Sequence, residues 1–154
     1  MWDIWHITRI EDITVNILIA DRAQVLDETW LERMGAEVRE TGNAMDDEEI
    51  LKFSRSLDPE TLREYRRAVG LRTREVLNGL TQLDIKRKIK PESVARILSE
   101  GGVTNDKKSI WLLDFWGGKN VAGILQMPVT RHQIVHLNEC VRIKGKLSKR
   151  EAKC

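Results

Sequence analysis

Cysteine, proline and long apolar runs are all scarce in this chain of 154 residues. Its two cysteines, Cys140 and Cys154, cannot form a disulfide framework, and without a C-x-x-C motif we expect reduced thiols and a cytoplasmic location. The longest apolar run, from Val121 to Leu125, is far shorter than the ~20 residues of a membrane-spanning helix. Asp3 and Arg9 interrupt the N-terminal segment before the apolar region of a signal peptide could form. We therefore expect no membrane partner.

Chain breakers are also few, with three prolines and ten glycines. Together with the many Leu, Ile, Glu, Lys and Arg residues, this favours helices over a β-sandwich. The 26 Lys and Arg residues nearly balance the 24 Asp and Glu residues, so the net charge of +2 indicates no nucleic-acid partner. The basic clusters at 86–90 and 142–153 lack the interleaved aromatic residues typical of nucleic-acid binding. We predict a single all-α domain over residues 1–154, with a frayed basic tail from about 148.

The N-terminal segment carries the clearest helical periodicity. A long helix over 2–28 is predicted by apolar-line residues at spacings of 4, 3, 4 and 3, namely His6, Ile10, Ile13, Ile17 and Ala20. The polar segment 29–45 is predicted to be a connection. Asp46 or Asp47 could then cap a short helix that ends near Leu57.

Helix caps and apolar spacing predict the remaining elements. Asp58-Pro59 is a favourable helix start, and the helix should run to about Leu80. Its apolar line consists of Leu62, Tyr65, Val69, Val76 and Leu80, with Thr73 as a polar intrusion. Further helical pieces are predicted at Pro91–Ser99, at 119–126 before Pro128, and at Val129–Leu147. In the last helix one stripe holds Val129, His132, His136, Cys140, Ile143 and Leu147.

The only three histidines, His6, His132 and His136, all occupy positions where the pattern expects apolar residues. His132 and His136 are four residues apart, so both imidazoles can converge on one ion. A buried imidazole without a partner is costly, and one metal ion would satisfy all three rings. Two ordinary alternatives stay open, because His136 could donate to a backbone carbonyl and His6 could lie in water near the chain end.

The segment His132-Gln133-Ile134-Val135-His136 is not the H-E-x-x-H motif of zinc proteases. Gln133 cannot titrate and so cannot serve as a general base, which disfavours that class. Cys140 lies about 12 Å along the helix from His132, too far for a fourth ligand, and we expect it in the core. Three nitrogen ligands would leave coordination positions open, as in catalytic or ligand-binding sites.

Six further residues are weaker candidates near these histidines. Asp3 and Glu139 could each accept the second N–H of an imidazole, or could be ordinary solvated acids. Trp5, like the other tryptophans at 2, 111 and 116, could belong to the core or to a pocket wall. Arg9 and Arg131 could bind an anionic substrate, or lie on the surface. Gln133 neighbours the first histidine of the pair.

Two segments resemble the DinB-like (YfiT-like) metal-binding superfamily. They are Trp5-His6-Ile7 with Arg9-Ile10-Glu11-Asp12, and Thr130-Arg131-His132-Gln133-Ile134-Val135-His136-Leu137-Asn138. The resemblance implies a four-helix bundle of up-down-down-up topology. It also implies a divalent metal, usually zinc or nickel, held by one histidine of the second helix and two of the last helix. By this resemblance His6, His132 and His136 are the metal ligands.

One departure concerns the helix that members of the superfamily carry before the segment that starts here at Met1. We expect this chain to lack that helix. The long connections 29–58 and 81–127 could cover part of the apolar surface that its absence leaves open. Otherwise an apolar groove stays open, and burying it in a homodimer is the simple remedy.

The resemblance implies a transferase or isomerase activity that depends on a small thiol, although many members of the superfamily have no assigned reaction. The first hypothesis is a metal-dependent enzyme, most simply a thiol S-transferase that uses a low-molecular-weight thiol and a small-molecule substrate. A metal-dependent hydrolase is its variant. The second hypothesis is a non-catalytic metal or small-molecule binding stress protein. A nucleic-acid binder is the third and remotest.

Overall fold

The computed structural model describes residues 1–151, and this part of the chain is helical. Its only β pairing is an isolated bridge between Lys88 and Asn120, so the all-α prediction is confirmed. The α-helices are α1 (Trp2–Asp12), α2 (Glu28–Met34), α3 (Asp47–Ser56), α4 (Pro59–Asn78), α5 (Gln82–Lys86), α6 (Pro91–Ser99), α7 (Lys107–Gly117), α8 (Val121–Gln126) and α9 (His132–Glu151). Two π-helical segments are η1 (Ile13–Ile19) and η2 (Met127–Arg131). Across this range no helix is both long and apolar enough to cross a bilayer.

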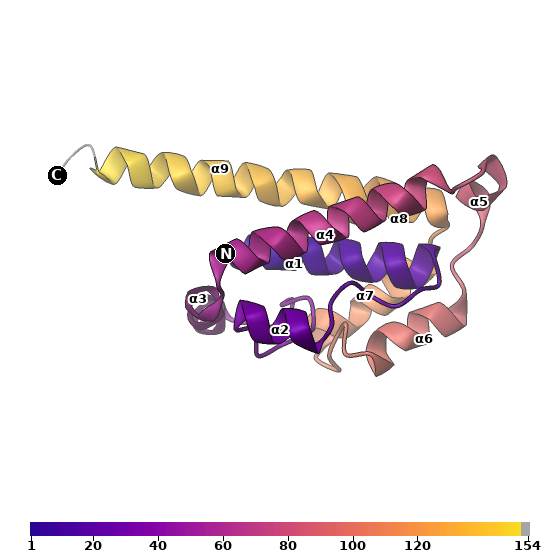
Figure 1. The fold of residues 1–154 in the computed structure, drawn as a ribbon, viewed down its shortest axis with the longest axis horizontal. Helices are drawn as coiled ribbons and strands as arrows, with labels where there is room; N and C mark the ends of the chain where they lie inside the picture. Colours follow the sequence, from indigo (N-terminus) through magenta and orange to yellow (C-terminus); the bar gives the residue numbers. More distant parts are fainter. Residues whose placement is uncertain (152–154) are drawn as a thin grey trace.

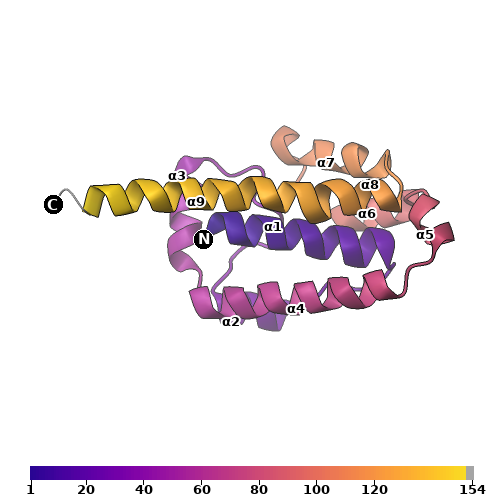
Figure 2. The same cartoon turned by 90° about the horizontal axis from the view of Figure 1, so that it is seen from above.

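Helix α1 with η1 forms the centre of the fold (Figure 1). In Figure 2 it lies between α4 and α9, while α2, α6 and α7 cover its other side in Figure 1. α1 and α4 run in the same direction, and α9 runs back along α1. Every residue from Trp5 to Ile19 is buried, as expected for a helix surrounded by other elements.

The predicted helix over 2–28 is wrong in its last third. Helical structure ends at Ile19, and Asp21 adopts a left-handed conformation with φ of 54°. The carboxylate of Asp12 then accepts hydrogen bonds from the backbone N–H groups of Val25 (2.8 Å) and Leu26 (3.0 Å). These bonds fold the chain back along its own helix, which the local pattern of residues 20–28 does not reveal.

The expected connection 29–45 also needs correction, because α2 occupies part of it. Asp27 caps α2 by accepting from the N–H of Trp30 at 2.9 Å, and Gly35 ends it in a left-handed conformation with φ of 66°. The Asp-Glu start and the Gly stop are ordinary helix signals. These signals lie in the part of the sequence where the pattern predicts the end of the helix over 2–28 and the connection 29–45.

Three other predicted helices are confirmed, and their caps explain their starts. Asp46 and Glu49 form a capping box at α3. Asp58 caps α4 through the N–H of Thr61, with Pro59 at the first helical position. α6 begins at Pro91 and ends at Ser99, as the spacing indicates. The buried side chains of α4 are Leu62, Tyr65, Val69, Thr73 and Val76.

The C-terminal helix is longer than predicted. α8 ends before Pro128, but the chain stays helical through η2 and enters α9 at His132. α9 continues to Glu151, so residues 148–151 are helical rather than frayed, and residues 152–154 lie outside the described part. Both views show its C-terminal part extending beyond the start of α1 (Figures 1 and 2).

The outer face of α9 leaves several large apolar side chains in contact with solvent. Their exposed fractions range from 47% at Leu137 to 69% at Val141. The set on the side opposite the histidines is Ile134, Leu137 and Val141. We call this set the α9 apolar face. An apolar surface of this kind on one helix is typical of a surface that another element covers.

Candidate metal centre

The three histidines meet at one end of the contact between α1 and α9. Their ring centroids are 4.9, 4.9 and 4.7 Å apart, and the ring planes cross at 64–68°. One nitrogen of each ring lies within 4.8 Å of the others. Three imidazoles whose planes cross steeply in a near-equilateral triangle can direct three lone pairs at a common point.

His6 is fixed on α1 by a backbone contact. It is 3% exposed, so the alternative of a solvated residue at the chain end is wrong. Its Nδ1 lies 2.7 Å from the carbonyl oxygen of Thr41, which can only accept, so Nδ1 carries the proton. Its Nε2 then presents a lone pair. Burial lowers the pKa of His6 to about 3, which keeps the ring neutral and able to bind a cation at neutral pH.

His136 is oriented by a carboxylate rather than by a backbone carbonyl. Its Nδ1 lies 2.9 Å from Oδ1 of Asp3, which accepts the ring proton and leaves Nε2 as the free nitrogen. Glu139 is more distant, with 3.9 Å between its carboxylate and the same Nδ1, and it also accepts from Arg142. Asp3 is therefore the carboxylate that sets the orientation of this ring, as in carboxylate–histidine–metal arrangements.

His132 faces His6 with 3.1 Å between the two Nε2 atoms. Its Nδ1 is buried and has no hydrogen-bond partner among the described residues, so only Nε2 is engaged. Burial lowers the pKa of His132 to about 4, and the ring is therefore neutral at neutral pH. In the absence of a cation the ring would have to donate its Nε2 proton to His6, and a single acceptor would then be its only contact.

This donor set fits a divalent transition metal. Two nitrogens bound to one ion at ~2.0–2.1 Å are roughly 2.9–3.4 Å apart for octahedral or tetrahedral angles. The 3.1 Å between the Nε2 atoms of His6 and His132 lies in that range. All-imidazole sites suit zinc, nickel, copper or iron, and carboxylate-preferring magnesium and calcium are disfavoured. His6, His132 and His136 would hold the ion, and the remaining coordination positions would face the cavity described below.

Gln133 ties the start of α9 to α1 and α4. Its amide N–H donates to the carboxylate of Glu11, and its amide oxygen accepts from Arg66 at 2.8 Å. Arg66 also donates to Glu11 at 2.6 Å, and the hydroxyl of Thr73 donates to the same carboxylate at 2.6 Å. The side chain adjacent to His132 is thus held by a closed polar network, which sets the register of α9 against α1.

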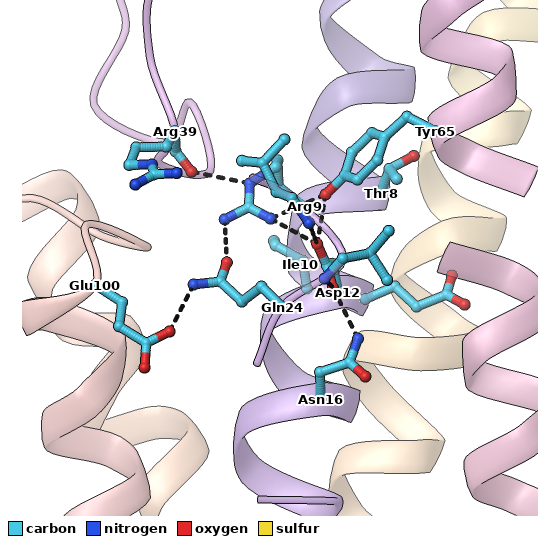
Figure 3. Close-up of polar contacts among 12 residues, drawn as sticks. Thr8, Arg9, Ile10, Asp12, Asn16, Gln24, Arg39, Tyr65 and Glu100 are labelled. Atoms are coloured by element: carbon cyan, nitrogen blue, oxygen red, sulfur yellow. Dashed lines mark hydrogen bonds and ion pairs between the residues drawn. The ribbon is translucent and has the colours of Figure 1, made fainter. Parts of the chain in front are cut away.

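Arg9 has a structural role, and the interpretation as an anion-binding or surface residue is wrong. Its side chain is fully buried and donates to Asp12 at 3.0 Å and to the hydroxyl of Tyr65 at 2.9 Å (Figure 3). It also donates to the carbonyl of Arg39 and to the side chain of Gln24. No part of this guanidinium is left for a substrate, because a buried charge needs all these partners.

The tryptophans divide between core and cavity. Trp5 is fully buried, donates its indole N–H to the carbonyl of Glu40 and packs on Phe53 and Tyr65, so it belongs to the core. Trp2 stacks on His6 with 4.6 Å between the ring centroids and 10° between the planes. A Cβ atom at Gly42, where φ is +82°, would lie 2.5 Å from Nε1 of Trp2, so glycine is required for this stacking.

Two other candidates lie apart from the histidines. Arg131 is exposed and does not line the cavity. Cys140 is half-buried rather than part of the core, and burial raises the pKa of its thiol, with Asp3 nearby. The sequence-based reasoning missed Thr41, Gly42 and Glu11, whose backbone or buried carboxylate positions the histidines. No spacing signal could have found them, since they act across the tertiary fold.

A cavity of about 420 Å³ adjoins the three imidazoles. Its walls come from α1, the segment around Gly42, α3, α7 and η2, and all three histidines line it.

Searches of protein-family models, curated proteins and solved structures find no match to this chain. The function proposed for this site therefore rests on the chemistry of its own residues.

Proposed function

We propose that this protein is a divalent-metal-dependent enzyme of the DinB-like type, and that its reaction is a thiol S-transfer. The observation that carries the proposal is the triangle of imidazoles, with ring centroids 4.7–4.9 Å apart beside a cavity. Two of the rings have their outer N–H groups fixed by Thr41 and Asp3. Pre-oriented neutral nitrogen donors are what a zinc or nickel site needs.

The directions of the long helices support the resemblance to that superfamily. An up-down-down-up bundle without its first helix would have two parallel helices followed by one antiparallel helix. α1, α4 and α9 follow this order, and the histidines come from the first and last of them (Figures 1 and 2). The shorter helices α6 and α7 pack where a further long helix could lie.

Thiol transfer is preferred because the cavity offers no general base. Besides the histidines, none of its lining residues has an ionisable side chain. A divalent ion held there would lower the pKa of a small thiol from ~8.5 and supply thiolate at neutral pH. The thiolate sulfur would form a bond to an electrophilic carbon of the substrate, and the leaving group would depart with its electron pair. The apolar walls would hold that substrate and exclude water.

A non-catalytic metal or small-molecule binding protein is the second candidate. Because no acid or base other than the histidines lines the cavity, binding without turnover is favoured and a metal-dependent hydrolase is disfavoured. A screen of small thiols with 1-chloro-2,4-dinitrobenzene distinguishes the two candidates. Metal-dependent release of chloride supports transfer, whereas no turnover with any thiol favours the binding protein.

Elemental analysis after chelator-free purification tests the metal directly. We expect about one equivalent of zinc or nickel per chain, and its loss in a His132→Ala variant. Arg131→Ala is the matched control, because that residue is the adjacent neighbour, is exposed and does not line the cavity. A protein without metal, or a His132→Ala variant that retains it, would overturn the proposal.

We also propose that a second copy of this chain covers the α9 apolar face. The projecting part of α9 carries exposed Lys144, Lys146 and Lys149, and the start of α3 exposes Asp47 and Glu48 at the same end of the molecule. Parallel, side-by-side pairing of two α9 helices about a twofold axis would keep each basic end at the same end of the dimer as the acidic α3 of the other copy. The α9 apolar face would then be buried between them.

A further inference from the structure

We propose that the walls of the cavity beside the histidines bind an uncharged, largely apolar molecule with a flat ring, and that these walls, without a metal ion at the histidines, discriminate against anions. Most of its lining side chains are apolar or aromatic. The aromatic ones are Trp2, Trp111, Phe115 and Trp116. Its volume of about 420 Å³ is that of a small-molecule site, for which apolar walls with few polar groups are typical.

The cavity walls carry no fixed charge. Among the lining residues there is no Lys, Arg, Asp or Glu. Lys119, which does not line the cavity, places its Nζ 3.9 Å from the ring centroid of Phe115 and forms a cation–π contact with that ring. Arg9 is committed to Asp12 and Tyr65. A carboxylate or phosphate bound against these walls would lose its hydration without gaining a charged protein partner.

The polar groups that are present suit a neutral ligand. Asn43 is the one lining side chain with an amide, and its oxygen accepts from the hydroxyl of Thr41 at 2.7 Å. The amide N–H groups of Asn43 suit a ligand that brings an uncharged acceptor, such as a carbonyl, nitro or ether oxygen. Trp111 and Phe115 are 48% and 36% exposed, so the aromatic surface reaches solvent on α7.

In calling this molecule the substrate, the inference rests on the proposed function. An electrophile with an uncharged aromatic body would lie against the aromatic walls, and the polar thiol would approach the histidines. Binding to the walls requires no metal, so the two ideas can fail separately.

A matched pair of probes tests the charge preference. Equilibrium dialysis of the full chain against 2-naphthamide and 2-naphthoate compares one ring system in neutral and anionic form. We expect saturable binding of the amide and at least about tenfold weaker binding of the carboxylate in chelator-treated protein. Equal or tighter binding of the carboxylate, or no saturable binding of the amide, would overturn the inference.

A charge introduced at Trp111 tests the location. Trp111→Lys should weaken amide binding and strengthen carboxylate binding, so that the ratio of the two affinities changes by about tenfold or more. Leu83→Lys is the control, because this substitution adds the same charge at a residue that is 85% exposed and does not line the cavity. Circular dichroism establishes that both variants are folded. An unchanged ratio in folded Trp111→Lys would place the binding elsewhere and contradict the inference.

Elemental analysis of the protein before chelator treatment separates the two proposals. Amide binding by a chain that never holds metal supports this inference and contradicts the proposed function. One equivalent of metal in a protein that does not bind the amide supports the proposed function and contradicts this inference.

Discussion

The carboxylate of Asp3, in the first turn of α1, accepts the Nδ1 proton of His136, from the second turn of α9, at 2.9 Å. This contact joins the two ends of the polypeptide and fixes which imidazole nitrogen of His136 faces the other histidines. Carboxylates in this position raise the basicity of a metal-bound histidine as well as orienting it. Asp3 would therefore raise the affinity of the proposed metal site without contacting the ion.

Replacing Asp3 should weaken metal binding while leaving the ligands in place. We expect Asp3→Asn to lower metal affinity by about 10–100-fold, measured by competition with a chromogenic chelator. Glu139→Gln is the control, since that carboxylate is 3.9 Å from the ring nitrogen and should matter much less. Equal losses in both variants would show that the effect is general charge and not the hydrogen bond.

Gln133 should affect both stability and the metal centre. Gln133→Leu removes the hydrogen bonds to Glu11 and Arg66, and we expect a loss of about 1–3 kcal/mol in urea unfolding. Because this contact sets the register of α9 beside His132, metal affinity should fall as well. Asn138→Ala, on the exposed side of the same helix, should change neither quantity. Wild-type metal affinity in Gln133→Leu would contradict the positioning role.

The buried ion pair of Arg9 and Asp12 should dominate the stability of the N-terminal half. Arg9→Met leaves the Asp12 carboxylate without its guanidinium, and we expect a loss of about 3–5 kcal/mol in the free energy of unfolding. Arg131→Met, an exposed arginine, should stay within about 0.5 kcal/mol of wild type. A small effect at Arg9 would mean that the network drawn in Figure 3 contributes little.

Dimer formation should depend on the α9 apolar face. Sedimentation velocity of the wild type should show a dimer, and Val141→Glu, at a side chain that is 69% exposed, should shift it to monomer. Leu83→Glu adds the same charge on α5 and should leave the dimer intact. A wild type that is monomeric at micromolar concentration would rule out this assembly.

Local patterns were sufficient where one helix determines its own structure. Helical spacing placed His6, His132 and His136 on apolar lines, and the Asp58-Pro59 pair located the start of α4. Spacing also kept Cys140 out of the ligand set. These signals are short-range, so they can be read without knowing the fold.

The rest depended on contacts between distant segments. The hydrogen bonds from Val25 and Leu26 to Asp12 ended the first helix early, and no residue near position 20 signals them. The prediction for Arg9 was wrong because an arginine without a nearby partner in the sequence resembles a surface residue. Its buried partner Tyr65 is 56 residues away and is brought close only by the fold. The support of His6 by Thr41 uses a backbone carbonyl, which carries no side-chain signature.

X-ray absorption spectroscopy of the protein purified without chelators tests most directly whether the three imidazoles share one ion. We predict a zinc or nickel edge with three imidazole nitrogens at ~2.0–2.1 Å plus oxygen scatterers from solvent, and no bound metal in His132→Ala. A spectrum dominated by sulfur or by carboxylate oxygen, or no bound metal, would contradict a centre built from His6, His132 and His136.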